Sequence, residues 1–380
     1  MDVSKRFVSL DVFRGATIAA MILVNNPGSW DHVYSQLRHA EWHGWTFTDW
    51  IFPFFLFIMG VAMAFSFPKR LQKGQSNSQL LMHALRRSLI LFALGLFING
   101  FPFGVIPGHE FSLNTWRIPG VLQRIAICYL VVSYLFLYSD NRRMVLWIFG
   151  LLTGYWLLMR FVSVPGFTRG TLEPLGNLCW YLDSKLLGGH TWVYAPVPGF
   201  DPEGILSTIP AIASTLVGVL CGKWLLSGKT NEEKTIWMYA MGNGLLLLGV
   251  ILNNWFPINK NLWSSSYVIF MSGWALICLA TIFWMVDLKG YRKWSSPFVI
   301  LGMNAILIFT LSEVLAMVLW TISWKLPDGN LITLHDYLYE HCFASWISQL
   351  NASLLFAIVF VLLMYLVAWL MWKKGWFLKV

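Results

Sequence analysis

The sequence has few charged residues. Asp, Glu, Lys and Arg make up only 12% of its 380 residues, while 57% are hydrophobic. A soluble domain carries about 25% charged residues, so this shortage excludes an ordinary soluble protein and predicts a polytopic membrane protein. The net charge of +9 does not indicate nucleic-acid binding, because the basic residues are dispersed among apolar segments and form no continuous arm.

Cysteine is also scarce. The chain has five cysteines and no C-x-x-C pair. Cys128, Cys221 and Cys278 lie in apolar segments, where we expect them to pack as small core residues. Cys179 and Cys342 fall in two predicted connections on one side of the membrane, and a disulfide between them is an open alternative.

Metal-binding motifs are absent from the sequence. His39 and His43 are four residues apart, so on a helix they would share a face and could bind a metal together with Asp31 or His32. No H-E-x-x-H or comparable motif accompanies them. We therefore expect no metal cofactor.

Long apolar segments dominate the sequence. Ten of them have the length of a membrane span: 9–26, 46–67, 84–101, 119–138, 144–161, 204–226, 235–255, 263–286, 297–320 and 352–372. The 22 tryptophans fit this number of membrane interfaces. No small-residue cleavage site follows the first segment, which we interpret as a retained span. The fold class is thus an all-α polytopic membrane protein with about ten transmembrane helices.

The distribution of Lys and Arg predicts the orientation. Ten crossings place both termini on one side, and the connections on that side carry most of the basic residues, so both termini are predicted to be cytoplasmic. The longer connections, 27–45, 102–118, 162–203 and 321–351, then face outward. We expect a single domain over residues 1–380 and find no internal repeat of the kind that builds many transporters.

A few charged residues fall inside the predicted spans, where charge is costly. Asp11 and Arg14 are three residues apart and form either a local ion pair or a cationic site for an anionic ligand. Arg117 and Arg124 flank the start of the fourth span. Glu313 lies deep in the ninth span, and a structural pair between Glu313 and Arg124 is one interpretation.

The stretch "HAEWHGWTFTDWIFP", residues 39–53, combines histidines and an aspartate with tryptophans. Thr46 and Asp49 fit a capping box at the start of a helix, which accounts for Asp49 without a catalytic role. Pro53 is predicted to kink the span about two turns inside this helix. Asn25, at the end of the first span, could be only a helix cap.

Polar residues also precede the sixth and eighth spans. Asp201 and Glu203 either cap a helix N-terminus or present carboxylates to a cationic amine. The segment "INKNLWSSSYV" places Asn261 beside Lys260 at the start of the eighth span. We predict a substrate-binding set of Asp201, Glu203, Trp42 and Asn261.

Seven stretches resemble the heparan-α-glucosaminide N-acetyltransferase family, including its bacterial NagX-like members. They occur in order along most of the chain: "SLDVFRG", "MILVNN", "HAEWHGWTFTDWIFPFFLFIMG", "RIPGVLQRIAICYL", "DPEGILSTIPAI", "NKNLWSSSYV" and "GMNAI". The resemblance implies a transmembrane enzyme that moves acetyl from cytoplasmic acetyl-CoA to the amine of a terminal glucosamine on the far side. It also implies that His39 is the reactive histidine and that Asn25 is the important asparagine of the first span.

Acetyl transfer from coenzyme A suggests roles for further residues. We hypothesise that Asp49 orients His39, as a carboxylate does in a triad, and that the cationic Arg6, Arg14, Arg124 and Arg117 bind the anionic coenzyme A. His39 would act either as a general base or through an acetyl-imidazole. The lysosomal members carry an additional portion before the first span, so we expect a small amino sugar as acceptor, a bacterial inner-membrane location and, as an open question, a homodimer. The competing class is an amino-sugar transporter that performs no acetyl transfer.

Overall fold

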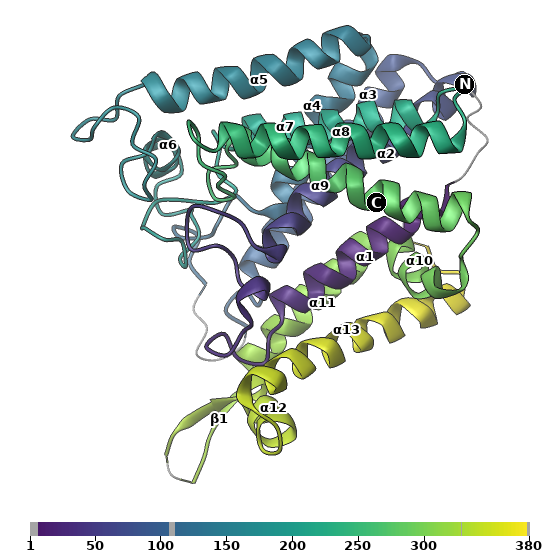
Figure 1. Ribbon diagram of the computed structural model, residues 1–380. Helices are drawn as coiled ribbons and strands as arrows, with labels where there is room; N and C mark the ends of the chain where they lie inside the picture. The colour runs from purple at the N-terminus through teal and green to yellow at the C-terminus, as the bar shows by residue number, and fades with distance from the viewer. Residues whose placement is uncertain (1–6, 106–110, 328, 378–380) are drawn as a thin grey trace.

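The computed structural model describes residues 7–105, 111–327 and 329–377, and most of these residues are in helices (Figure 1). The helices are α1 (Val8–Asn25), α2 (Ile51–Gln72), α3 (Asn77–Gly100), α4 (Val121–Tyr138), α5 (Asn141–Phe161), α6 (Leu178–Leu186), α7 (Thr208–Leu225), α8 (Asn231–Leu252), α9 (Ser265–Phe283), α10 (Ser296–Met303), α11 (Ala305–Thr321), α12 (Leu334–Tyr339) and α13 (Gln349–Lys373). Two short strands, β1 (Ser323–Lys325) and β2 (Leu331–Thr333), form an antiparallel hairpin that the sequence did not predict.

The predicted number of spans is confirmed. Among the described residues, nine helices are long and apolar enough to cross a membrane, or ten if one bent pair is a single span. That pair replaces the straight span expected over 297–320, because the helix axis turns by 74° between α10 and α11. Asn304 leaves the helical conformation there, with φ −121° and ψ 35°, and its side chain donates a hydrogen bond to the carbonyl of Trp376 at 3.0 Å.

The helices form two groups that meet along α1 and α2. One core joins α1, α10, α11 and α13, and two further cores join α2, α4, α7, α8 and α9. In Figure 1, α1 begins and α13 ends on the right, whereas the connections that follow α1 and α5 gather at the left. We call this left-hand end the His39 end. The connections α1–α2, α3–α4, α5–α7 and α8–α9 contact one another there.

Small residues let the helix backbones approach closely. A Cβ atom at Gly60 in α2 would lie 2.0 Å from the carbonyl oxygen of Thr215 in α7, and one at Gly218 would lie 2.1 Å from the carbonyl of Phe57. Gly218 and Gly222 form a small-xxx-small pair on α7, a spacing that brings transmembrane helices together. The sequence analysis overlooked this pair, and it packs α7 against α2 of the same chain.

Pro53 does not kink its span, contrary to the sequence prediction. A 3₁₀ turn at Phe47–Trp50 precedes α2, so Pro53 lies in the first turn of the α-helix, where a missing N–H costs no helical hydrogen bond. The carbonyl of Asp49, four residues earlier, instead accepts a hydrogen bond from the hydroxyl of Tyr267 at 2.6 Å. This hydrogen bond ties the start of α2 to α9.

The cysteines are all free. Cys179 is buried, and its thiol lies 3.2 Å from the hydroxyl of Tyr155. Cys342 is exposed on the segment after α12. The disulfide considered from the sequence is therefore absent, because the two thiols belong to different packing environments.

We expect Gly60→Ala to destabilise the protein. The added methyl group would meet the α7 backbone, and overpacking of this kind costs about 1–3 kcal/mol. The melting temperature in detergent, followed by tryptophan fluorescence, should fall by several degrees. Gly154→Ala in α5 is the matched control, because a Cβ there meets nothing within 4 Å. Equal melting temperatures for the two variants would contradict the close packing of α2 on α7.

Candidate active site

The start of α2 fixes the carboxylate of Asp49. One oxygen, Oδ2, accepts hydrogen bonds from the backbone N–H of Thr46 at 2.9 Å and of Ala40 at 3.1 Å. The Thr46 hydroxyl donates to the same oxygen at 3.1 Å. The capping box predicted from "TFTD" is confirmed. The side chain of Asp49 is 1% exposed and is held by the backbone of the segment that precedes the helix.

The second oxygen of Asp49 binds His39. Nδ1 of the imidazole lies 2.6 Å from Oδ1. An ionised carboxylate only accepts hydrogen bonds, so Nδ1 carries the proton and a neutral ring keeps its lone pair on Nε2. Asp49 therefore performs both tasks that the sequence left as alternatives, helix capping through Oδ2 and orientation of His39 through Oδ1.

Nε2 of His39 faces a lysine. The Nζ atom of Lys260 lies 3.1 Å from Nε2 and 3.4 Å from Nδ1. Although 48% of the His39 side chain is exposed, the surrounding protein lowers the pKa of the imidazole below its ordinary value of 6.5, and the charge of Lys260 lowers it further. Asp49 opposes this shift. The ring is thus kept neutral near pH 7, with Nε2 available as a base or nucleophile.

The turn before α9 positions Lys260. Its neighbour Asn259 is fully buried and donates a hydrogen bond to the carbonyl of Trp42 at 2.8 Å, and it accepts one from the N–H of Leu262 at 2.8 Å. The N–H of Gly44 donates to the carbonyl of Ile258 at 2.8 Å. These bonds fasten the turn that carries Lys260 directly to the turn that carries His39.

Arg117 pairs with the two carboxylates before α7. Its Nε and Nη2 atoms bind the two oxygens of Asp201 at 2.8 and 2.7 Å, and Nη2 also lies 2.7 Å from Glu203. Asp201 accepts two further hydrogen bonds, from the backbone N–H groups of Trp192 and Glu203. The sequence suggested that these carboxylates could bind a cationic amine. Both are instead already paired with Arg117.

Glu203 also connects this pair to the His39 turn. Burial alone would raise its pKa, but the charges of Arg117, Lys260 and Arg124 hold the pKa of Glu203 below its ordinary value. The loop that carries it rests on Asp183 of α6, whose Oδ1 accepts the N–H of Ile205 at 3.0 Å. Burial raises the pKa of Asp183 to about 7. Glu203 therefore stays ionised within a rigid loop.

Arg124 is buried beside the same loop. It is 1% exposed, and its Nη2 atom donates hydrogen bonds to the side chain of Ser207 and to the carbonyl of Gly204. Its guanidinium lies 5.0 Å above the ring of Trp263. Glu313 is not its partner, contrary to one sequence interpretation. The carboxylate of Glu313 instead accepts a hydrogen bond from the Asn25 side chain at 3.2 Å.

The predicted catalytic residues are therefore not all in contact. Among the described residues, no hydrogen bond joins Asn25 to His39. Arg14 forms an ion pair with Asp11 at 3.4 Å. It precedes Asn25 by eleven positions of α1, which is about 16 Å along the helix axis, and so lies toward the opposite end of the bundle. Arg6 lies outside the described residues.

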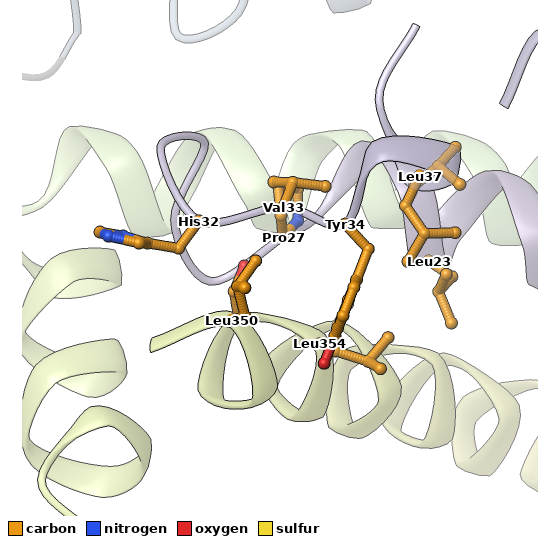
Figure 2. A pocket seen from close by; sticks show the side chains of 11 residues that line it. Leu23, Pro27, His32, Val33, Tyr34, Leu37, Leu350 and Leu354 are labelled. Carbon is orange, nitrogen blue, oxygen red and sulfur yellow. The ribbon is translucent and has the colours of Figure 1, made fainter. Parts of the chain in front are cut away.

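The connection after α1 is fastened to α13 (Figure 2). The N–H of Gly28 donates to the carbonyl of Ser353 at 3.1 Å, and the hydroxyl of Tyr34 donates to Asn351 at 2.6 Å. A narrow pocket between the two segments is lined mainly by apolar side chains, among them Pro27, Val33, Leu37, Leu350 and Leu354. Its lining includes no Lys, Arg, Asp or Glu, so we place the candidate site at His39 instead.

The remaining candidates lie around the His39 turn. Trp42 donates a hydrogen bond to the carbonyl of Leu172 at 2.9 Å and so joins the turn to the α5–α7 connection. Asn261 follows Lys260 in the turn before α9. His43 lies 3.3 Å from Asn259 and apart from the Asp49 contact. In the described ranges, no group of three or more His, Cys, Asp or Glu residues could hold a metal ion.

Sequence reasoning missed the role of Lys260. The sequence did single out this lysine, because Lys260 in "NKN" is one of the few basic residues in the connections predicted to face outward. Its pairing with His39 could not be read from the sequence, because 221 positions separate the two residues. The same holds for Tyr267, whose hydroxyl reaches the backbone of Asp49.

Comparison with known proteins assigns the family. The profile described as "Heparan-alpha-glucosaminide N-acetyltransferase, catalytic" matches residues 6–251. The chain is 34% identical to the human heparan-alpha-glucosaminide N-acetyltransferase over 86% of this chain and 55% of that protein. It is 32% identical to the mouse protein of the same name over 86% of this chain and 56% of that protein. It thus spans about half the length of these relatives. The profile covers more than half of the chain, and the chain belongs to the heparan-alpha-glucosaminide N-acetyltransferase family.

Proposed function

We propose that this chain is a transmembrane N-acetyltransferase that moves acetyl from acetyl-CoA to the amine of a glucosamine-type sugar. The donor enters from the cytoplasm, at the end of the bundle where α1 begins, and the acceptor binds at the His39 end. The observation that carries the proposal is the Asp49–His39 pair, which leaves Nε2 of a neutral imidazole at the membrane surface. Family membership supports acetyl transfer as the reaction.

The chemistry assigned to His39 has two forms. In one, Nε2 attacks the thioester carbonyl, the thiolate of coenzyme A leaves, and the acetyl-imidazole then acetylates the amine. In the other, Nε2 takes a proton from the amine as the amine attacks the thioester. Asp49 stabilises the positive ring that both routes create, in the manner of the carboxylate in a catalytic triad.

The donor side is assigned from charge. Coenzyme A carries phosphates, which would remain near the basic end where Arg14 lies, while its thioester extends toward the His39 end. Arg124 is buried near the His39 end, beside the loop before α7, and its Nε and Nη1 atoms have no hydrogen-bond partner among the described residues. Buried donors of this kind suit the polar groups of the pantetheine arm. The sequence also suggested that Arg117 binds coenzyme A. We do not include it in the proposed coenzyme A site, because its guanidinium is paired with Asp201 and Glu203.

The acceptor side is assigned from the surface of the His39 turn. Trp42 lies in the same connection as His39, and Asn261 follows Lys260 in the turn before α9. Aromatic rings with a few polar groups are typical of small-molecule sites, and the human relative is named for an α-glucosaminide acceptor. A small amino sugar is the acceptor we propose for this chain, with a bacterial inner membrane as its location.

His39→Ala should abolish acetyl transfer. General acid–base catalysis by one side chain contributes about 10²–10⁴ in rate, so thiol release from acetyl-CoA with glucosamine present should fall by at least 10²-fold. Purified protein in detergent is assayed for free thiol and for N-acetylglucosamine.

His43→Ala is the matched control, since this histidine lies four residues away and bonds to Asn259 rather than to Asp49. It should retain activity within a few fold. Equal thiol release by wild type and His39→Ala would remove His39 from the mechanism. Glucosamine flux into proteoliposomes without any consumption of acetyl-CoA would identify a transporter instead.

Arg14→Gln should raise the KM for acetyl-CoA more than the KM for the sugar, because the change removes a cation at the donor end alone. Steady-state kinetics with each substrate varied in turn measures both constants. Arg169→Gln, on the exposed α5–α7 connection at the His39 end, is the control and should leave both constants unchanged. A larger effect of Arg14→Gln on the sugar would refute this placement of coenzyme A.

A further inference from the structure

Lys260 is a partly buried cation next to the reacting nitrogen, and the family resemblance did not assign it a role. Its Nζ atom lies 3.1 Å from Nε2 of His39, within hydrogen-bond distance. Lys260 comes from the turn before α9 and His39 from the connection before α2, so the contact is tertiary. Asn259 and Gly44 fasten the two turns together, which fixes the position of the lysine relative to the imidazole.

We propose that the ammonium of Lys260 is a catalytic group that stabilises the oxyanion formed when the acetyl thioester is attacked beside His39. The inference rests on the proposed acetyl transfer. As the attacking nitrogen bonds to the carbonyl carbon, the π electron pair of the C=O bond moves to oxygen. Lys260 donates a hydrogen bond to that oxygen. When the intermediate collapses, the pair returns, the C–S bond breaks and the thiolate of coenzyme A leaves with its electrons.

The geometry suits this task in either route. In the covalent route the oxygen is bonded to the carbon that Nε2 attacks, so it lies only two bonds from Nε2, and an ammonium in contact with Nε2 reaches it by a small rotation. In the general-base route the amine lies between Nε2 and the same carbon. A donor about 3 Å from both the base and the developing charge is the arrangement that oxyanion stabilisation requires.

Asn25 is less suited to the same task. Its amide donates to Glu313, and among the described residues it forms no hydrogen bond with His39. Lys260, by contrast, has two carboxylates within electrostatic range, Glu203 and Asp49, which favour its charged form. Burial is the larger influence and lowers the pKa of Lys260, as do the charges of Arg124 and Arg117. A cation with a lowered pKa is a stronger hydrogen-bond donor to an oxyanion.

Lys260 also acts on the resting enzyme. The charged groups that face His39 are Asp49 at the start of α2, Lys260 before α9 and Glu203 before α7. Burial and Lys260 lower the pKa of the imidazole, whereas Asp49 and Glu203 raise it. Removing the lysine charge must therefore raise the pKa of His39. A role of Lys260 in packing alone would not produce this shift.

Lys260→Met tests both parts of the proposal. Diethylpyrocarbonate modifies only neutral imidazole, so the pH at half-maximal modification rate of His39 reports its pKa, with His39→Gln protein subtracted as background. We expect this midpoint to lie below 6.5 in the wild type and to move to higher pH in Lys260→Met. The kcat should fall by about 10²–10³, the usual effect of losing one oxyanion donor, with little change in KM.

Lys260→Arg keeps the charge and should retain the wild-type midpoint and part of the kcat. Lys260→Gln repeats the loss of charge with a more polar side chain, in case Lys260→Met does not fold. Lys185→Met, at an exposed lysine of α6 at the same end, is the control and should change neither quantity.

An uncharged variant with the wild-type midpoint and kcat overturns the proposal. A second result would also overturn it. If the uncharged variant loses kcat, Lys260→Arg restores none of it and the midpoint for His39 stays at the wild-type pH, then Lys260 has only a structural role. The modification assay needs no turnover. If the wild type consumes no acetyl-CoA, the proposed function fails on its own, and the midpoints still decide whether Lys260 controls the charge of His39.

Discussion

The Asp49 carboxylate determines the arrangement of the rest of the site. One oxygen is occupied by the backbone where the chain enters α2, so the acid cannot move without unwinding the start of that helix. The other oxygen is thereby held in a fixed direction, and the imidazole of His39 binds to it. The same carboxylate thus caps the helix and bonds to the imidazole, and the hydrogen bonds of the cap fix the direction of the bond to His39.

The surrounding charges alternate in sign outward from His39. The cation of Lys260 lies beside the imidazole, the carboxylate of Glu203 is the next charge outward, and the guanidinium of Arg117 pairs with Glu203. Each of these partly buried charges therefore has an opposite neighbour, which offsets the cost of removing it from water. The series crosses three separate connections, before α9, before α7 and before α4. The loops at the His39 end are consequently held together by electrostatics as well as by the aromatic contacts of Trp42.

Much of the fold could be predicted from the sequence, because the length of an apolar run is a local property of the chain. The span limits agree with the helices to within a few residues at most positions. The bend at Asn304 was missed because composition is apolar on both sides of it. Pro53 was misplaced by the unrecognised 3₁₀ turn ahead of α2. In the candidate site, "TFTD" gave Asp49 from local spacing, whereas the Lys260–His39 and Arg117–Asp201 pairs join distant positions and have no local signature.

The connection between α1 and α2 is attached to both helix groups of the bundle. Its first part is bonded to α13 through Gly28 and Tyr34, and its second part is bonded to the turn before α9 through Trp42 and Gly44. His39 lies between these two anchor points. Any rotation of one helix group against the other therefore pulls on the segment from both ends and changes the position of the imidazole. His39 thus lies on a segment that is bonded to both helix groups. The position of its Nε2 atom, where we propose that the chemistry occurs, therefore depends on how the two groups are placed relative to each other.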